Sequence, residues 1–450
     1  MFRTLNLIVC IFAITTLGFA QNPIIQNVYT ADPAPLVQGE TLYLYTGHDE
    51  DHATSRGFIM KDYWCFSTTD MLNWTQHGPV FSTDSLKWAS KNNANAAQVA
   101  YRDGKFYYYI SPWSALKDGG DCIAVGVSDS PTAYFKDALG KPMINPSQTT
   151  YGKHAWEDID PTILIDDDGQ AYMYWGNNAL YCVRLNKDMV SYSGDIITFD
   201  IKDKKAFGPD YEEAPWIFKR NGIYYLMYAA HVPEAVYYAT ATSPVGPWTY
   251  GGVVMEAWAQ GSMGNHPGVA QFKGQWYFFY MNQDLPGGHD KKRAVNVIPL
   301  QFNVDGSIPT HKHEKSGLAK GHGYLNPFQR TEAETMAWGE GIEVAFSKGN
   351  NFIRDIQSGD YVKVRAVDFG KGAKKFEASL DSIAAGSSIE IRLDAVNGPL
   401  LATCKVKSKK PGWNTQKWGV KRVEGVHDVY FVYKGGQGPL FHIDWWKFSK

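Results

Sequence analysis

Hydrophobic and polar residues alternate along most of the chain in short, aromatic-rich runs, a pattern typical of β-strands and not of helices. The clearest runs each follow a turn that contains a glycine, and five such turns recur 52 to 65 residues apart, at Gly39, Gly104, Gly169, Gly222 and Gly274. Each repeat is long enough for about four short strands. The pattern predicts an all-β fold with a five-bladed β-propeller over residues 21–310. The alternative is a β-sandwich whose turns are evenly spaced by chance.

Composition narrows the class of protein. The 450 residues are enough for two domains of about 100–200 residues each. The net charge is −2, and without a basic excess nucleic acid is not an expected partner. Aromatic residues make up 14% of the chain, which favours strands, ring-lined clefts or both.

The N-terminus predicts export. Residues 1–20 contain one arginine, then an apolar core, then Gly18-Phe19-Ala20, which is typical of a signal peptide cleaved after Ala20. A membrane anchor needs about 20 continuous apolar residues, and this core is shorter. We expect a monomer that is secreted or periplasmic, without a membrane partner. Its remaining cysteines are expected to be buried thiols: Cys65, Cys122, Cys182 and Cys404.

The repeats also place polar residues at matched positions. The innermost strand of each predicted blade is the short run before the turn glycine, and the first residues of these runs are Asp32, Asn95, Asp160, Glu213 and His266. Equivalent points around a closed ring face one axis, so we expect these side chains to converge. The alternative is that each caps a strand or loop.

Three converging carboxyls suit glycoside hydrolysis. That reaction needs an acid to protonate the departing oxygen and a base to activate water, and an inverting enzyme holds the two about 6.5–9.5 Å apart. A third carboxyl beside the acid raises its pKa by like-charge repulsion, so that it stays protonated near neutral pH.

At these residues the chain resembles glycoside hydrolase family 43, the five-bladed propeller hydrolases of plant-wall pentosans. The segments that carry the resemblance are 31–35, 158–162, 213–225 and 264–268. The resemblance implies an inverting mechanism in which Asp32 is the general base, Asp160 orients and tunes the acid, and Glu213 is the general acid. Neighbouring Glu212 competes for the acid role, and Glu213 is preferred because Ala-Pro follows it.

Further roles follow from the same resemblance. His266 would face a bound calcium ion or its waters on the propeller axis, and Arg293 would bind substrate near the acid. Segments 43–50 and 61–66 look most like the arabinoxylan arabinofuranohydrolase branch, which removes arabinofuranosyl branches from xylan. The expected partner is therefore arabinoxylan or a related pentosan. The alternatives are a β-xylosidase, an arabinan hydrolase, or a non-catalytic carbohydrate-binding protein.

Tryptophans are candidates for sugar stacking, because flat apolar sugar faces pack on aromatic rings. We select Trp88 and Trp113 as cleft-lining residues, with Trp156 and Trp258 as further candidates. Each can equally belong to the core.

The repeat pattern stops at residue 310. Residues 311–327 are expected to form a linker, and fresh alternating runs over 328–450 predict a β-sandwich of jelly-roll type. This part resembles a carbohydrate-binding module of family 6, on residues 332–334, 359–361, 412–413 and 443–446. The resemblance implies a structural calcium ion held by Glu332, Glu334 and Asp444, and sugar stacking on Trp413. Two positions depart from that family: its sugar-binding asparagine falls at His442, and an aromatic residue falls at Asp355.

Overall fold

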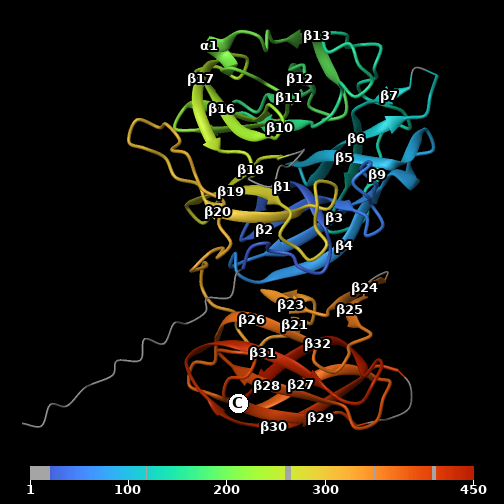
Figure 1. Cartoon of the computed structure of the whole chain (residues 1–450), viewed down its shortest axis with the longest axis vertical. Coiled ribbons are helices and arrows are strands. Elements are labelled where there is room, and N and C mark those ends of the chain that lie inside the picture. Colours follow the sequence, from blue (N-terminus) through green and yellow to red (C-terminus); the bar gives the residue numbers. More distant parts are fainter. Residues whose placement is uncertain (1–20, 118, 259–264, 348–349, 408–411) are drawn as a thin grey trace, which may run out of the picture.

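The computed structural model describes residues 21–450 except for 118, 259–264, 348–349 and 408–411, so the predicted signal peptide lies outside the described residues. The described chain is all-β and forms two lobes that follow one another in sequence (Figure 1). Within the described residues, helical structure is confined to the 3-10 turn η1 (Thr83–Ser85) and the four-residue helix α1 (Lys204–Phe207). In the described residues no helix has the length and apolar character needed to span a membrane.

The described residues of the N-terminal lobe form four sheets. The first includes β1 (Thr30–Gln38), β2 (Thr41–Asp49), β3 (Met60–Thr68), β4 (Trp74–Ser82), β5 (Ala89–Arg102), β6 (Lys105–Ser114), β7 (Gly120–Asp121), β8 (Ala124–Ser128) and β9 (Lys136–Asp137). The next two contain β10 (Thr162–Ile165), β11 (Ala171–Trp175), β12 (Tyr181–Leu185) and β13 (Tyr192–Thr198), then β14 (Glu213–Arg220), β15 (Ile223–Ala230), β16 (Ala235–Ala241) and β17 (Thr249–Met255). The last contains β18 (Gly268–Phe272), β19 (Gln275–Asn282) and β20 (Ala294–Pro299).

All five predicted hairpins are present. Antiparallel pairs β1–β2, β5–β6, β10–β11, β14–β15 and β18–β19 each close on one of the repeated glycine turns. At the second turn, Asp103 has φ +50° and Gly104 has φ +82°. Positive φ at both central residues is the geometry that matches the twist of the flanking strands, and glycine adopts it without steric cost. The repeated glycines therefore fix the register of each first hairpin.

The first strands of the hairpins lie beside one another. β1 contacts both β5 and β18, β10 contacts β5 and β14, and β14 contacts β18. The N-terminal segment then runs along β20: Ile24 N–H donates to the Val295 carbonyl at 3.0 Å, and the Asn22 side chain bonds both backbone groups of Val297. The beginning and the end of this lobe are thus held together.

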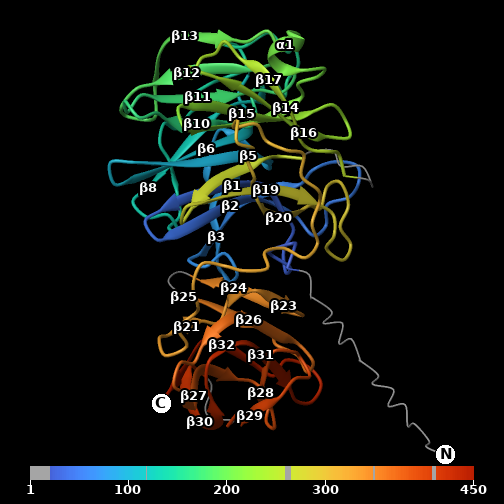
Figure 2. The same cartoon turned by 90° about the vertical axis from the view of Figure 1, so that its left-hand side faces the viewer.

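In the C-terminal lobe, the residues that the structure describes form two sheets around one apolar core (Figure 2). One contains β21 (Thr331–Glu332), β24 (Glu343–Ser347), β25 (Asn350–Arg354), β27 (Ala373–Ser382), β30 (Asn414–Val423) and β32 (Phe441–Ser449). The other contains β23 (Trp338–Glu340), β26 (Tyr361–Asp368), β28 (Ser388–Leu393), β29 (Leu400–Lys405) and β31 (Val426–Lys434). Buried Phe376, Phe431 and Trp446 pack against one another between the sheets.

The two lobes are docked on each other. Strand β22 (Thr335–Met336) leaves the C-terminal lobe and pairs with β4 of the N-terminal lobe. Phe346 packs on Trp64 with ring centroids 4.9 Å apart, and any side chain at Gly78 would overlap the Phe346 ring. The segment predicted as a linker joins this contact, because Gln21 and Asn22 donate to its backbone carbonyls.

Arg365 is the polar centre of the docking. Its guanidinium donates to the carbonyls of Leu318 at 2.9 Å and Ala319 at 3.0 Å and to the side chain of Gln21, and its backbone N–H donates to Asn73 at 2.8 Å. One side chain therefore ties together the N-terminus, the segment between the lobes and the C-terminal lobe.

Replacing this side chain tests the docking. Arg365→Ala removes the guanidinium contacts and is expected to lower the free energy of unfolding by about 1–3 kcal/mol. It should also speed proteolysis within residues 311–327, measured by limited digestion alongside thermal unfolding. Arg392→Ala is the matched control, because Arg392 pairs with Glu390 inside the C-terminal lobe at 2.9 Å. Equal proteolysis of both variants would contradict the docking role.

Candidate active site

A cavity of about 80 Å³ opens where the first strands of the sheets begin. The structure brings the three predicted carboxyls together here: Asp32, Asp160 and Glu213 all line the cavity. Asn95, His266 and Arg293 line it too, so every residue expected at the matched repeat positions is present. The remaining lining residues are Phe58, Met60, Ala96, Ile159, Ala214 and Glu234.

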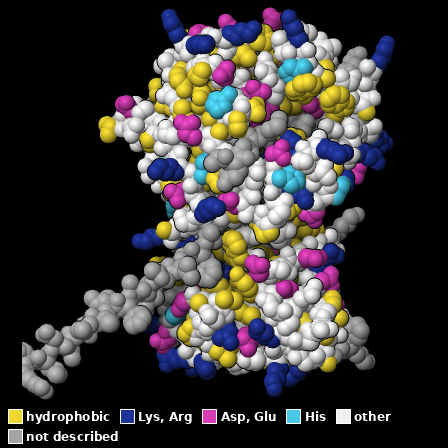
Figure 3. All heavy atoms as spheres, in the orientation of Figure 1, with side chains coloured by type: hydrophobic (Ala, Val, Ile, Leu, Met, Phe, Trp, Pro, Cys, Tyr) yellow, Lys and Arg dark blue, Asp and Glu magenta, His cyan; other side chains and the backbone are white. Residues whose placement is uncertain are grey.

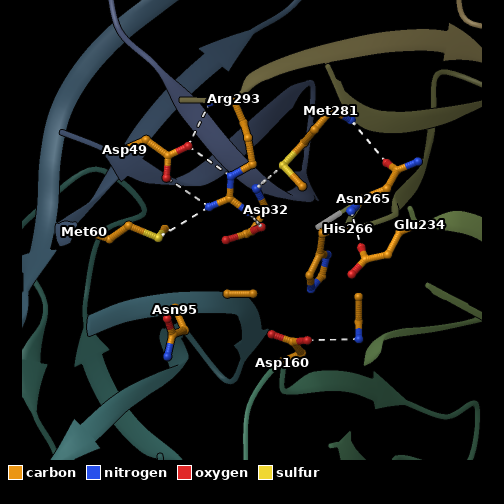
Figure 4. A network of polar contacts seen from close by, with 12 residues as sticks. Asp32, Asp49, Met60, Asn95, Asp160, Glu234, Asn265, His266, Met281 and Arg293 are labelled. Atoms are coloured by element: carbon orange, nitrogen blue, oxygen red, sulfur yellow. Dashed lines mark hydrogen bonds and ion pairs between the residues drawn. The ribbon is translucent and has the colours of Figure 1, made fainter. Parts of the chain in front are cut away.

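A buried ion-pair network holds Asp32. The Arg293 Nη1 atom lies 2.9 Å from Asp32 Oδ1, and its Nε and Nη2 atoms donate to the two oxygens of Asp49 at 2.9 and 3.0 Å (Figure 4). Asp49 is fully buried at the end of β2 and also accepts the Arg293 backbone N–H at 2.8 Å. Arg293 therefore positions Asp32. The family resemblance had instead implied that Arg293 binds substrate near the acid.

The backbone is left-handed at or directly after each of the three carboxyls, in each case at the residue that precedes a proline. Asp32 has φ +52°, Asp160 has φ +62° and Ala214 has φ +56°. The strand register shifts beside two of them, between Ala31 and Ala34 and between Glu213 and Trp216. Such backbone costs about 1–3 kcal/mol per residue and occurs at functional sites where the surrounding structure enforces it. Here it aims the carboxyls at the cavity, since a regular strand would alternate them away.

Hydrogen bonds hold the carboxyls of Asp160 and Glu213 next to each other. The Asp160 Oδ2 atom accepts the Ala214 backbone N–H at 2.9 Å, and Asn177 donates to Glu213. Burial, and then the charges of Glu213 and Asp32, raise the pKa of Asp160 well above its usual value. Burial also raises the pKa of Glu213, although hydrogen bonds from Glu234 and then Asn177 oppose the shift. A carboxyl in this environment is suited to hold a proton near neutral pH.

Glu234 is a cavity carboxyl that sequence reasoning missed. It lies between β15 and β16, is 3% exposed, and accepts the Asn265 backbone N–H. Its carboxyl contacts that of Glu213, and burial together with the Glu213 charge raises the pKa of Glu234 well above its usual value. Two carboxyls in contact share a proton and titrate as a pair. Glu234 occupies no repeat position, so the spacing contains no signal for it.

A second acidic pair lies behind the cavity. Asn95 donates to Asp121 at 3.0 Å, and Thr149 and Trp175 donate to Asp158 at 2.7 and 2.8 Å. Burial, and then the Asp158 charge, raise the pKa of Asp121 to about 8. Burial raises the pKa of Asp158 to about 7. Asn95 is therefore held in the cavity wall from behind.

Of two further candidates, His266 lines the cavity and Glu212 does not. His266 is buried, its Nδ1 atom lies 3.2 Å from the Pro267 carbonyl, and its Nε2 atom has no hydrogen-bond partner in the described chain. Burial lowers the pKa of this imidazole. Glu212 does not line the cavity; it accepts a hydrogen bond from Asn178 at 3.0 Å. The geometry thus separates Glu213 from its competitor.

The tryptophans predicted to line the cleft lie outside the cavity wall. Trp88 is only 7% exposed, packs in the core, and donates to Asp137 at 2.9 Å, so its predicted stacking role does not match its position. Trp113 lies in β6 opposite Asp121, and Trp258 packs against His313 at 4.7 Å. Trp156 is 54% exposed and its ring lies 4.6 Å from that of His154. An aromatic residue type alone does not distinguish core from cleft.

Two of the three predicted calcium ligands of the C-terminal lobe form ion pairs with the side chain of Arg330. Arg330 pairs with Glu332 at 2.7 Å and with Asp444 at 3.4 Å. Burial, and then the charges of Glu332 and Asp444, raise the pKa of Glu334 to about 8, and its Oε2 atom has no hydrogen-bond partner in the described chain. Across residues 21–450, leaving aside the four gaps, no group of three or more His, Cys, Asp or Glu side chains is arranged to hold a metal ion.

Trp413, the predicted sugar platform of this lobe, is 41% exposed. Its ring makes an edge contact with Phe352 at 5.1 Å, and Phe352 in turn lies 5.5 Å from His442. His442 accepts the backbone N–H of Asp355 at 3.1 Å, so the two positions that depart from the expected pattern bond to each other.

Comparisons with known proteins agree with this geometry. The family model described as glycosyl hydrolases family 43 matches residues 20–308, and that of carbohydrate binding module (family 6) matches residues 332–450. The chain is 32% identical to an arabinoxylan arabinofuranohydrolase of Bacillus subtilis (strain 168), with 95% of this chain and 92% of that relative covered.

Solved structures extend the likeness to the fold. A family 43 arabinoxylan arabinofuranohydrolase from Bacillus subtilis, in complex with cellotetraose, superimposes with a TM-score of 0.82 at 31% identity, covering 96% of this chain and 98% of that one. A family 43 β-xylosidase/α-arabinofuranosidase from a compost metagenome, in complex with xylotriose and in a calcium-free form, gives a TM-score of 0.57 at 29% identity and covers 64% of this chain and 96% of that one. The family model and the end-to-end relative agree: this chain belongs to glycosyl hydrolases family 43.

Proposed function

We propose that the protein removes α-L-arabinofuranosyl side chains from arabinoxylan with inversion of configuration. The observation that carries the proposal is the cavity, in which Asp32, Asp160 and Glu213 converge in a chain similar throughout its length to an arabinoxylan arabinofuranohydrolase. Glu213 donates a proton to the departing oxygen, and Asp32 takes a proton from the attacking water. Asp160 orients the acid by accepting the backbone N–H of Ala214, the residue after Glu213, and Glu234 shares the proton of the acid.

The fold that we infer for the N-terminal lobe is a five-bladed propeller. Five hairpins with neighbouring first strands support it, as does the N-terminal segment beside β20. The two sheets of residues 328–450 form a β-sandwich of jelly-roll type in this proposal, with 311–327 as the connection. The leader at residues 1–20 supports export to the periplasm or the medium, where the polysaccharide is accessible.

Calcium is a proposed structural ion at two places. In the C-terminal lobe, Glu332, Glu334 and Asp444 would hold it, and the unpartnered Glu334 oxygen supports this because calcium prefers hard oxygen ligands. An ion there would compete with the Arg330 contacts. In the cavity, the unpartnered Nε2 atom of His266 would face an ion through water. The chemistry that calcium supplies in both places is charge neutralisation, and no proton transfer depends on it.

The products test the substrate assignment. Arabinose release from arabinoxylan, measured by sugar analysis, is expected to exceed xylose release, and nitrophenyl α-L-arabinofuranoside should be cleaved faster than nitrophenyl β-D-xyloside. Xylose release without arabinose would instead support the β-xylosidase alternative. Arabinose release from arabinan alone would make the enzyme an arabinan hydrolase. If no pentosan were hydrolysed, the result would support the alternative that the protein binds carbohydrate without catalysis.

The acid is tested by substitution. Glu213→Gln removes the donated proton while keeping the shape of the side chain, so kcat on arabinoxylan is expected to fall by about 10²- to 10⁴-fold. Binding of xylan oligosaccharides should persist. Glu212→Gln is the matched control, because that carboxyl lies outside the cavity and bonds Asn178. A larger loss in Glu212→Gln than in Glu213→Gln would transfer the acid role to Glu212.

The pH profile tests the shared proton. The acid must be protonated, so activity falls as the pH rises through the raised pKa of Glu213. The protonated Glu234 carboxyl donates a hydrogen bond to Glu213, and this bond lowers the pKa of Glu213 because it stabilises the charged form. Glu234→Leu removes the donor, so the pKa of Glu213 rises and the alkaline limb of kcat/KM is expected to move to higher pH by about one unit. An alkaline limb that stays in place, with only the maximum reduced, would show that Glu234 is structural.

A further inference from the structure

A groove of about 840 Å³ lies between the two lobes, distinct from the catalytic cavity. Its volume is within the range of about 300–1,000 Å³ typical of ligand sites. The N-terminal lobe contributes Tyr29, Asp51 and Pro286, and the C-terminal lobe contributes Trp338, Glu340 and Asp360. Strand β23, which begins at Trp338, lies at the waist of the molecule, where apolar and acidic side chains gather on the face shown (Figures 1 and 3).

The groove and the catalytic cavity share no lining residue, but one rim of the N-terminal lobe separates them. Tyr29 precedes β1, its hydroxyl donates to the Pro286 carbonyl at 2.7 Å, and the Lys292 ammonium lies 5.1 Å from its ring. The backbone carbonyl of Tyr29 accepts the N–H of Asp49, the partner of Arg293. On the other side of this rim, Arg293 lies over the ring of Phe58, which lines the cavity. Contacts from Tyr29 through Asp49 to Arg293 therefore connect the wall of the groove to the wall of the cavity.

The lining has the chemistry of a neutral sugar site. Tyr29 and Trp338 are half-buried aromatic rings on facing lobes, suited to stack on sugar faces. The carboxylates of Asp51 and Glu340 belong to exposed residues and make no side-chain hydrogen bond or ion pair with the described part of the chain, so their oxygens are available to sugar hydroxyls. Asp360 accepts the Gln357 N–H at 2.7 Å, and burial followed by the charge of Glu340 raises its pKa. This excess of acids disfavours anionic ligands.

We propose that this groove binds the xylan main chain beside the branch that the catalytic cavity cleaves. The inference deepens the proposed function and rests on it. Stacking on Trp338 and hydroxyl contacts with Glu340 would hold the main chain across the two lobes. The C-terminal lobe would then contribute to the substrate site directly, through the edge that faces the cavity, and separately from the platform at Trp413.

The test compares a polymer with a small substrate. In Trp338→Ala, kcat/KM on arabinoxylan is expected to fall about five- to tenfold, whereas kcat/KM on nitrophenyl α-L-arabinofuranoside stays within about twofold of the wild type. Glu340→Gln should show a smaller loss of the same kind. Tyr324→Ala is the matched control, because Tyr324 is an aromatic residue outside the groove with 65% exposure. Thermal unfolding checks that each variant is folded.

Any other outcome contradicts the proposal that the groove binds the xylan main chain. An unchanged rate on arabinoxylan would show that the polymer does not use Trp338, and equal losses on both substrates would show a structural role. A loss in Trp413→Ala without one in Trp338→Ala would place the main chain on the outer platform. Binding of linear xylo-oligosaccharides to Glu213→Gln, with and without Trp338→Ala, separates the two proposals. Equal binding by both variants overturns the groove, whereas wild-type protein without turnover overturns only the proposed hydrolase.

Discussion

The ion pair between Arg293 and its two aspartates is the contact on which the cavity depends. Five carboxyls surround this site: Asp32, Asp49, Asp160, Glu213 and Glu234, all of them largely withdrawn from solvent. An isolated buried charge is costly, and only one cation is available among the residues that line the cavity. Arg293 compensates Asp32 and Asp49, so the remaining carboxyls are driven towards their protonated forms.

This division of charge separates the catalytic roles. A carboxylate paired with a guanidinium at 2.9 Å is held as a base in a fixed orientation, as Asp32 is. Glu213 makes no ion pair within 4 Å in the described chain; burial and then the charges of Glu212 and Asp32 raise its pKa, which suits an acid. The same residue types therefore acquire opposite functions from their surroundings. The left-handed backbone at Asp32 and Asp160 belongs to this arrangement, because it directs both side chains at one small space.

How much of this was predictable depends on where each residue lies in the repeat. The turn glycines defined the five hairpins, and counting back from them located Asp32, Asp160 and Glu213. Asp49 was readable in principle, since the β1–β2 hairpin pairs Thr30 with His48 and so brings the end of β2 beside the start of β1. Glu234 was not readable, because its place depends on how the turn between β15 and β16 packs across β14.

Docking of the lobes is the feature that the sequence predicts least. It also has the largest effect on how a polymeric substrate can bind. Residues 311–327 have the composition of a linker, yet Arg365 bonds their carbonyls and β22 adds to a sheet of the other lobe. Thr335 of β22 and Thr75 of β4 are 260 positions apart, and no local pattern encodes their pairing. A tethered module would only raise the local concentration of polymer. A docked one has fixed geometry, so its edge at Trp338 stays at a constant distance from the cavity. Fixed geometry allows binding energy from a remote part of the polymer to orient a branch at the carboxyls, which a flexible tether cannot do.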